Sequence, residues 1–352
     1  MTKVRYLEII KRKSKKLSIP FLLYLLICNL LAVGLYEYIG QNHFFENKLY
    51  FVNDLDHRMV PNSAPDINSD GIRSLRESDE FDDSTDNIVF LGDSFVYGWG
   101  VNFEHSIPHL LEKKLNQDQS TDKYKVANFG WISSSPMLSH RLLQDMGSKY
   151  RPKWIFLGLD MSDFHDDLKY RNILERKGLM ASLDYTPITL LTLRKVTSRS
   201  DFLHRQLFGF PGRRFFISDR PLIKSIDFFQ ETQKNINEIF HFSKNKLKAR
   251  FILFVFPRAY QYSKGSSPNN WEKDEYDEMG KYSLEPFKYF ENLKKIQSDY
   301  PIHSLLPDFV DSEVFPTTFE ADPHWNESGN EIAAEAIHKF FKGKLNKKTV
   351  NQ

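Results

Sequence analysis

The stretch FLGDSFVYG at residues 90–98 places a Gly-Asp-Ser turn directly after an apolar run at 88–91. A tight turn at the end of a buried strand lifts a serine hydroxyl above the sheet, where a general base can reach it. A candidate base, His324, lies in the segment DPHWN at 322–326. The two segments can meet only in a folded domain, and together they predict a hydrolase that uses Ser94, His324 and Asp322.

Outward from this turn, the chain alternates between two kinds of segment. Apolar runs that predict strands lie at 87–91, 124–128, 153–159, 250–256 and 302–306. Helical patterns lie between and after them, at 104–117, 135–149, 226–248, 284–298 and 327–343. Several of the strand runs are apolar almost throughout, as expected for strands buried on both faces. The alternation predicts a three-layer α/β/α domain over residues 86–345, with about five parallel strands.

The N-terminus has the pattern of a membrane anchor. Residues 1–16 hold seven Lys or Arg against one Glu, and the uncharged run LSIPFLLYLLICNLLAVGLY follows at 17–36. About twenty apolar residues suffice to span a ~30 Å hydrocarbon core. We therefore expect a basic cytoplasmic tail at 1–16, a single transmembrane helix at 17–37 and an extracytoplasmic catalytic domain. A cleaved signal peptide is the alternative, but no small-x-small cleavage site follows the run.

Charge and cysteine content exclude several classes of function. The whole chain has a net charge of +2, of which the first sixteen residues contribute +6, so the rest is slightly acidic. This distribution argues against nucleic acid as a partner. The one cysteine, Cys28, lies within the predicted membrane helix. An intrachain disulfide, a thiolate nucleophile in the exported domain and a cysteine-based zinc site are therefore excluded.

Two segments do not follow the alternation of strands and helices. We interpret residues 38–85 as an arm and linker. Residues 165–225 form a predicted insertion, in which 171–225 carry eleven Lys or Arg and four Asp or Glu. The insertion is either a lid that contacts anionic lipid or an acidic glycan, or a solvated excursion whose aromatic residues pack on the main domain, and we favour the second.

The two motifs resemble the first and last sequence blocks of the SGNH, or GDSL-type, hydrolases, particularly membrane-anchored bacterial members. The resemblance covers roughly residues 66–343 and implies a flavodoxin-like α/β/α fold. It implies that Ser94 is the nucleophile, His324 the general base and Asp322 the residue that orients the imidazole. Asp322 lies two residues before His324, where many members of the family have three, and this spacing resembles an Asp-x-His-x-Asn variant of the motif.

The resemblance also implies an oxyanion hole. The family builds it from the N–H of the nucleophile, the N–H of a glycine after the second strand and an asparagine side chain after the third. Here the glycine aligns with Ser133 and the asparagine with Ser162, whose hydroxyl donates but reaches less far. Losing one such donor costs about 10²- to 10³-fold in rate. Asp93, Asn128 and Gly130 complete the candidates for oxyanion or substrate binding.

Two further clusters have simpler interpretations. The run Asp163-Phe164-His165-Asp166-Asp167 is expected to lie in a loop that scatters its side chains, so neither a metal site nor any other cofactor is predicted. The segment NSDGIR at 68–73 is interpreted as a structural turn, although it could brace the rim of the active site and leave Arg73 available for a carboxylate or phosphate.

Three functions are consistent with these features. The first is an acyl-transfer enzyme that hydrolyses or moves an acyl group, such as acetyl, on a cell-surface saccharide. The second is a lipid or lysophospholipid esterase, which the anchor and the basic insertion favour. The third is a non-catalytic glycan-binding or assembly protein that retains the fold, motivated by Ser162 at the expected asparagine position.

Overall fold

The computed structural model describes the greater part of the chain, in two compact units. The described residues are 19–28, 30–31, 49–52, 56–117, 123–175, 200–209, 221–263, 265, 270, 272, 279–296 and 299–349. Residues 48–176 and 213–352 form one unit, and residues 1–47 and 177–212 form the other. All candidate site residues belong to the first of these, the catalytic unit.

A five-stranded parallel sheet forms the centre of the catalytic unit, as the alternating pattern predicts. In the order β4-β3-β5-β6-β7, its strands are Tyr124–Gly130, Asp86–Gly92, Trp154–Leu159, Arg250–Val255 and Ile302–Ser304. The chain runs from β3 outward to β4 and then returns to pair β5 on the other side of β3. This reversal makes a topological switch point at the carboxyl ends of β3 and β5, which is where open α/β sheets bind ligands.

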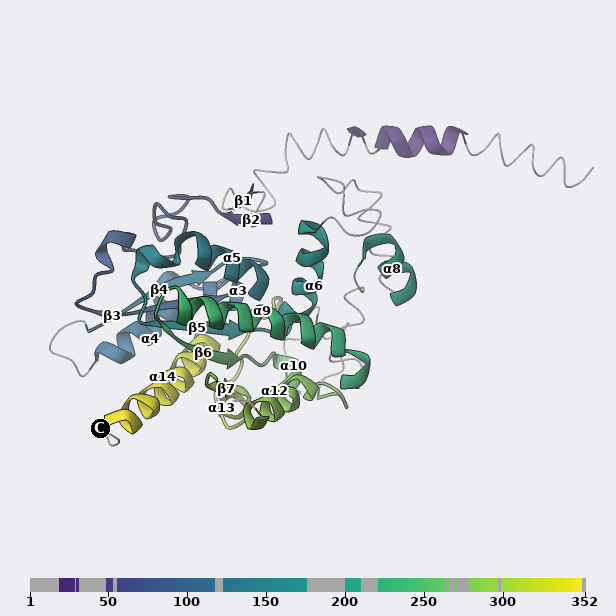
Figure 1. The fold of residues 1–352 in the computed structure, drawn as a ribbon. Coiled ribbons are helices and arrows are strands. Elements are labelled where there is room, and N and C mark those ends of the chain that lie inside the picture. The colour runs from purple at the N-terminus through teal and green to yellow at the C-terminus, as the bar shows by residue number, and fades with distance from the viewer. Residues whose placement is uncertain are drawn as a thin grey trace, which may run out of the picture. The chain divides into compact units, whose positions relative to one another are not determined.

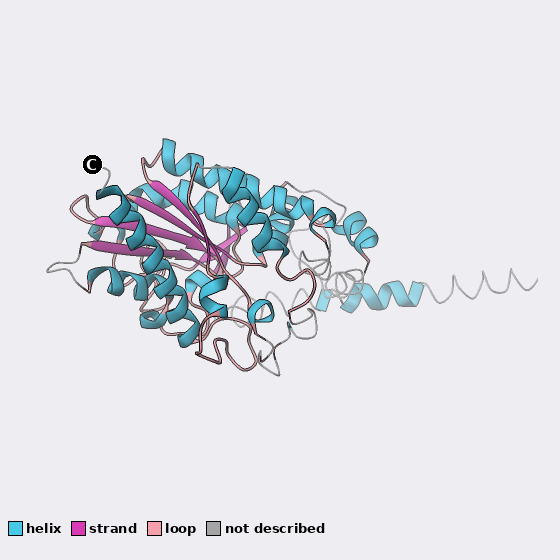
Figure 2. Cartoon of the chain, turned by 90° about the horizontal axis from the view of Figure 1, so that it is seen from below, coloured by secondary structure: helices cyan, strands magenta, loops and turns pink. Residues whose placement is uncertain are grey.

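Helices cover both faces of the sheet, so the predicted three-layer arrangement is confirmed (Figure 2). The helices α4 (Ile107–Asn116) and α14 (Glu327–Thr349) contact each other, and their apolar residues share one cluster with β3, β5 and β6. A second contacting group consists of α5 (Pro136–Met146), α6 (Asp163–Leu174) and α9 (Ile226–Asn245).

The remaining elements are short or peripheral (Figure 1). An antiparallel hairpin is formed by β1 (Leu49–Val52) and β2 (Asp56–Met59). Among the described residues, the other α-helices of the catalytic unit are α3 (Ser94–Tyr97), α10 (Ala259–Tyr262), α12 (Glu285–Ile296) and α13 (Leu306–Val310). Single 3₁₀ turns are η2 (Ser78–Glu80), η3 (Phe103–His105), η4 (Gly147–Tyr150) and η7 (Leu222–Lys224). The helix α8 (Asp201–Phe208) belongs to the other unit.

Burial on both faces explains the composition of the strands. In β3, Ile88 and Phe90 lie in the apolar cluster shared with α4 and α14, while the alternate residues Val89 and Leu91 are equally buried. Successive side chains of a strand point to opposite faces, so a strand covered on both faces must be apolar at every position. This requirement produces the uninterrupted apolar run that precedes Gly92.

Outside the sheet, the segments agree less fully with the sequence expectations. The run at 163–167 does not lie in a loop, because these residues begin helix α6, so the expectation of a loop was wrong. Residues 222–225 of the predicted insertion form η7 and its cap, and most of 176–220 lies outside the described residues. Within the predicted anchor, residues 19–28 and 30–31 are helical and the rest is outside the described part. No helix among the described residues is both long enough and apolar enough to cross a membrane.

One close contact fixes the turn that carries Ser94. A Cβ atom added to Gly130, at the end of β4, would lie 2.4 Å from the backbone nitrogen of Tyr97 and 2.9 Å from the carbonyl oxygen of Asp93. These are backbone atoms of α3 and its cap and cannot rotate away. Only glycine at position 130 therefore lets α3 pack directly on β4.

We expect Gly130→Ala to lower the free energy of unfolding by about 3 kcal/mol or more, because the added methyl group must displace backbone. Gly343→Ala is the matched control, since nothing lies within 4 Å of a Cβ at that position of α14. There the substitution should stabilise by about 0.5–1 kcal/mol, as in other helix interiors. Urea unfolding of both variants measures the difference, and equal midpoints for Gly130→Ala and wild type would contradict the packing argument.

Candidate active site

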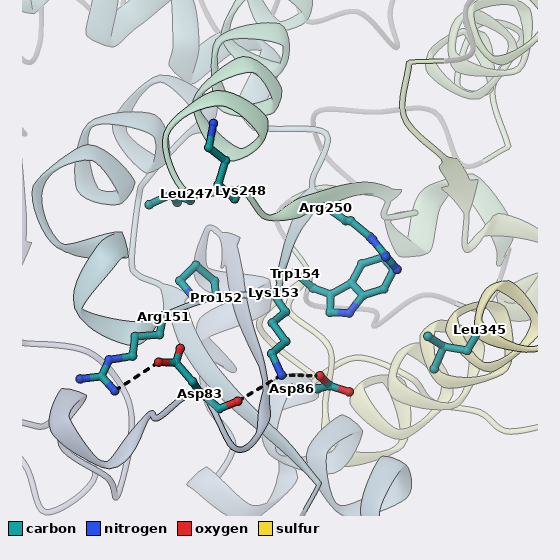
Figure 3. A pocket seen from close by; sticks show the side chains of 10 residues that line it. All are labelled: Asp83, Asp86, Arg151, Pro152, Lys153, Trp154, Leu247, Lys248, Arg250 and Leu345. Carbon is teal, nitrogen blue, oxygen red and sulfur yellow. Dashed lines mark hydrogen bonds and ion pairs between the residues drawn. The ribbon is translucent and has the colours of Figure 1, made fainter. Parts of the chain in front are cut away.

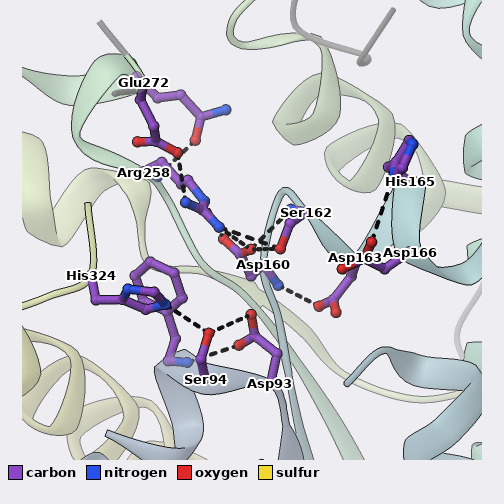
Figure 4. Close-up of polar contacts among 12 residues, drawn as sticks. Asp93, Ser94, Asp160, Ser162, Asp163, His165, Asp166, Arg258, Glu272 and His324 are labelled. Atoms are coloured by element: carbon purple, nitrogen blue, oxygen red, sulfur yellow. Dashed lines mark hydrogen bonds and ion pairs between the residues drawn. The ribbon is translucent and has the colours of Figure 1, made fainter. Parts of the chain in front are cut away.

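Ser94, His324 and Asp322 meet at the carboxyl edge of the sheet. The Ser94 Oγ lies 2.7 Å from His324 Nε2 (Figure 4). His324 Nδ1 is hydrogen-bonded to Asp322 Oδ1, which also accepts the backbone N–H of His324 at 2.8 Å. A carboxylate can only accept, so Nδ1 carries the hydrogen and Nε2 is left to accept from the serine hydroxyl. The three side chains thus have the geometry of a nucleophile, a base and an orienting acid.

The turn that presents Ser94 is built by its neighbours. Asp93 caps α3, since its Oδ1 accepts the N–H of Phe95 at 2.9 Å. At the other end, Gly98 takes a left-handed φ of 84°, and its N–H donates to the Ser94 carbonyl at 3.0 Å. The result is a single helical turn locked at both ends. Ser94 is consequently held directly above the end of β3.

The histidine is fixed by aromatic contacts as well as by Asp322. The Phe95 ring packs 4.9 Å from the His324 ring, and the Trp99 ring lies 6.3 Å away, both measured between centroids. Burial raises the pKa of Asp322, but hydrogen bonds and charge from His324, with a further hydrogen bond from the Trp99 side chain, outweigh it and leave the pKa below its usual value. Asp322 is therefore ionised and can stabilise an imidazolium.

Two backbone N–H groups remain as candidate oxyanion donors. Within the described residues, neither the N–H of Ser94 nor that of Ser133 donates to another protein group. Ser133 has a φ of 58°, in the left-handed region that favours glycine. Its loop is tied to the nucleophile turn, because Ser134 Oγ donates to the Gly92 carbonyl at 2.7 Å.

Asn128 and Gly130 have structural contacts instead. The Asn128 amide donates to the Tyr97 carbonyl at 3.2 Å, and its oxygen accepts the Gly130 N–H at 3.0 Å. One amide hydrogen of Asn128 and the N–H of Gly130 are thus occupied, and Asn128 is only 1% exposed. These two residues hold β4 against α3 rather than present donors to a substrate.

Ser162 is also engaged. Its hydroxyl donates to Asp160 Oδ2 at 2.5 Å, and the same carboxylate accepts the Ser162 N–H at 2.9 Å. A hydroxyl has one hydrogen to donate, so in this arrangement Ser162 has none left for an oxyanion. The two backbone donors are then the ones that the described site offers.

A buried guanidinium anchors this part of the site. Arg258 forms a two-pronged pair with Asp160, with Nε at 2.8 Å and Nη2 at 2.7 Å, and its Nη1 lies 2.6 Å from Glu272 (Figure 4). Burial raises the pKa of Asp160, but the Arg258 charge and hydrogen bonds outweigh this effect and hold the pKa below its usual value. The Arg258 guanidinium also lies 4.9 Å from the Phe95 ring centre and so reaches the packing around His324.

Asp93 and Asp163 behave in the opposite way. Burial and then the neighbouring charge of Asp160 raise the pKa of Asp93 to about 8, and burial and the charges of Asp93 and Asp160 raise the pKa of Asp163. With a pKa of about 8, the Asp93 carboxyl group is mostly protonated at neutral pH. Asp160, beside Arg258, is the one of these three carboxyl groups whose pKa is lowered.

This shift predicts a pH dependence of stability. Between pH 3.8, the ordinary pKa of an aspartate, and about 8, native Asp93 keeps a proton that the unfolded chain has lost. The free energy of unfolding therefore falls as pH rises through this window. Asp93→Asn removes this dependence and keeps the helix cap, because asparagine caps as well as aspartate. Urea unfolding at pH 5 and pH 8 should show a smaller loss for Asp93→Asn than for wild type, and equal losses would contradict the shift.

The segment at 68–73 braces the nucleophile turn from the other side. The Arg73 Nη1 donates to the carbonyls of Tyr97 and Gly98 at 2.7 and 2.9 Å, and its Nη2 donates to that of Val101 at 3.0 Å. Its Nε pairs with Asp66 at 2.8 Å. Arg73 is thus committed to the end of α3 and is not available for a substrate carboxylate or phosphate.

Sequence reasoning missed several residues of the site. Arg258 follows the strand β6, and its place after a strand of a parallel sheet is the signal that could have indicated it. Trp99 lies only five positions after Ser94, but nothing in the local sequence links it to Asp322. Glu272 follows no strand and carries no such signal.

The pocket drawn in Figure 3 lies away from Ser94, His324 and Asp322. It has a volume of about 460 Å³, and Asp86, Trp154 and Arg250, which begin β3, β5 and β6, line it. Ser94 follows the opposite end of β3, so this pocket is remote from the triad. Among the described residues, no cluster of three or more His, Cys, Asp or Glu side chains is placed to hold a metal ion.

Comparisons with known proteins give only structural neighbours. No protein-family model matches the sequence, and no curated protein matches it. The esterase EstA from Pseudoalteromonas sp. is 14% identical, with a TM-score of 0.41 over 74% of this chain and 99% of that one. A GDSL-like lipase from Bacteroides thetaiotaomicron is 13% identical, with a TM-score of 0.40 over 74% and 89%. An acetyl xylan esterase is 14% identical, with a TM-score of 0.39 over 71% and 97%. Likeness this distant does not transfer an activity, so the assignment rests on the geometry of the site.

Proposed function

We propose that this protein is a serine esterase or acyltransferase that works through an acyl-Ser94 intermediate. The observation that carries the proposal is the 2.7 Å contact between Ser94 Oγ and His324 Nε2, with Asp322 behind the imidazole. Ser94 and His324 are 230 positions apart in the chain, and neither contact is needed to complete a helix or a strand. A serine so placed has the base that an alcohol nucleophile requires.

The reaction follows from these contacts. His324 Nε2 takes the hydroxyl proton as Ser94 Oγ attacks the ester carbonyl, and Asp322 stabilises the imidazolium that forms. The negative charge on the carbonyl oxygen faces the N–H groups of Ser94 and Ser133. His324 then protonates the departing alcohol and leaves the acyl group on Ser94. Water, or a second hydroxyl acceptor, attacks the acyl-enzyme with His324 again as base.

We further propose that the acyl group is small and that it is carried by a cell-surface saccharide. The support is the predicted N-terminal anchor, which would place the catalytic domain outside the membrane. Large apolar side chains of its described part, such as Phe21, Leu26 and Leu30, are more than half exposed. An exposed apolar surface of this kind is expected for a helix that lies in lipid. A lipid ester remains the alternative substrate, and rates on matched acetyl and long-chain esters of one alcohol separate the two.

Covalent labelling tests the activity itself. A fluorophosphonate phosphonylates a serine, with loss of fluoride, only when a base activates the hydroxyl. The folded protein should therefore incorporate one label at Ser94, which peptide mass spectrometry locates. The Ser94→Ala variant should incorporate none. Absence of label in a wild-type protein of native circular dichroism would reject catalysis and favour a binding protein that retains the fold.

A further inference from the structure

The N–H of Ser133 belongs to a peptide unit that is held from behind. The carbonyl of the same unit, that of Ile132, lies 2.8 Å from His57 Nε2. A carbonyl only accepts, so His57 donates through Nε2. The N–H and C=O of a trans peptide point in opposite directions. A donor fixed on the Ile132 oxygen therefore determines where the Ser133 N–H points.

A second side chain holds the next carbonyl. The Tyr170 hydroxyl, from α6, donates to the Ser133 carbonyl. The His57 ring lies 5.8 Å from the Tyr170 ring and 6.4 Å from that of Trp131, between centroids. His57 is 6% exposed, although it comes from β2 in the predicted arm. The peptide units on both sides of the Ser133 Cα are thus each tied to a buried side chain.

This arrangement opposes a specific strain. A left-handed conformation costs a residue with a side chain roughly 1–2 kcal/mol, and Ser133 adopts it with a φ of 58°. Rotation of the Ile132–Ser133 peptide would relieve the strain and change the direction of the Ser133 N–H. Hydrogen bonds of about 1 kcal/mol each offset a cost of this size. A donor on the carbonyl also polarises the peptide and strengthens its N–H as a donor.

We propose that His57 and Tyr170 are positioning residues for the oxyanion hole, which hold the Ile132–Ser133 peptide with its N–H toward the tetrahedral intermediate at Ser94. The inference rests on the proposed acyl-transfer function. Because His57 lies in β2, the β1–β2 hairpin then takes part in catalysis by orienting the Ile132–Ser133 peptide, without contacting the substrate.

The test uses the full chain and two readouts, turnover of 4-nitrophenyl acetate and the second-order rate of fluorophosphonate labelling. Loss of a whole oxyanion donor costs about 10²- to 10³-fold, so misorienting one should lower kcat and labelling by about 10- to 100-fold in His57→Ala. KM should change little, because the contact acts on the transition state. Tyr170→Phe should show a smaller loss, and His57→Gln, which retains an N–H donor, should recover part of the rate.

Tyr150→Phe is the matched control. The buried Tyr150 hydroxyl accepts from Asn68 at 2.9 Å and donates to Asp70 at 3.2 Å, so its hydrogen bonds hold the same arm at residues 68 and 70. Its kcat should equal that of wild type once corrected for folded fraction. Equal losses of kcat in Tyr150→Phe and His57→Ala would show that arm docking matters and the peptide does not, and would overturn the inference.

The remaining outcomes are distinct. If the wild-type protein is labelled, wild-type rates in folded His57→Ala overturn the positioning role and leave the proposed function standing. If His57→Ala does not fold, wild-type rates in both Tyr170→Phe and His57→Gln have the same meaning. An unlabelled wild-type protein overturns the proposed function and this inference with it.

Discussion

Replacing either Ser94 or His324 by alanine is expected to lower kcat by on the order of 10⁴- to 10⁶-fold, the largest effect that the structure predicts. Without Ser94 there is no oxygen to carry the acyl group. Without His324 the serine hydroxyl keeps its proton, because the other group near Oγ is Asp93 at 3.4 Å, whose pKa of about 8 leaves it protonated at neutral pH.

The double variant distinguishes a catalytic pair from two independent residues. Members of a triad act as a unit, so Ser94→Ala with His324→Ala should be little slower than either single variant. His140→Ala is the control for removing a partly buried histidine, since His140 pairs with Glu238 on α9 at 3.4 Å, away from the triad. Initial rates on 4-nitrophenyl acetate at matched folded fraction give the comparison. Near-normal turnover in either single variant removes that residue from the mechanism.

Asp322→Asn should lower kcat by about 10⁴-fold, as a neutral amide does in place of the acid of other triads. Asp322 Oδ1 accepts both the ring Nδ1–H and the backbone N–H of His324, so the carboxylate fixes the tautomer and the ring orientation together. An asparagine can offer its amide hydrogens to Nδ1, which favours the tautomer that cannot accept from Ser94. The spacing of two residues between Asp322 and His324 permits this role, because Asp322 Oδ1 accepts both N–H groups of His324.

Two further variants make this test specific. Glu320→Gln alters an exposed carboxylate of the same loop and should leave kcat unchanged. Trp99→Phe removes the indole N–H that helps to hold Asp322, so a smaller loss of about 10-fold is expected, as for other residues that orient a site ligand. Asp322→Asn with more than a tenth of the wild-type kcat would assign the orienting role to another group.

The elements of the fold were largely predictable. Each of the five strands lies within a residue or two of its expected position, because burial on both faces demands an apolar run and turns interrupt it. The exception, the run at 163–167, carries too many polar residues for an apolar stripe, yet it forms the start of α6. Asp163 accepts the N–H of Asp160 and Asp167 accepts the N–H of Met137, so tertiary contacts rather than helical periodicity decide the surroundings of these side chains.

The sequence by itself determined the strands of the sheet, the turn that presents Ser94 and the DPHWN segment as its candidate partner, because each is a pattern of residues close together in the chain. Only the tertiary structure decided which of the candidate oxyanion donors have a hydrogen left to donate. The hydroxyl of Ser162 is tied to Asp160, one amide hydrogen of Asn128 and the N–H of Gly130 are used within β4 and α3, and the peptide before Ser133 is held by His57. Hydrogen-bond capacity is a property of what surrounds a group. A residue's type states what it can donate, and the folded neighbours determine whether a donor remains for the substrate.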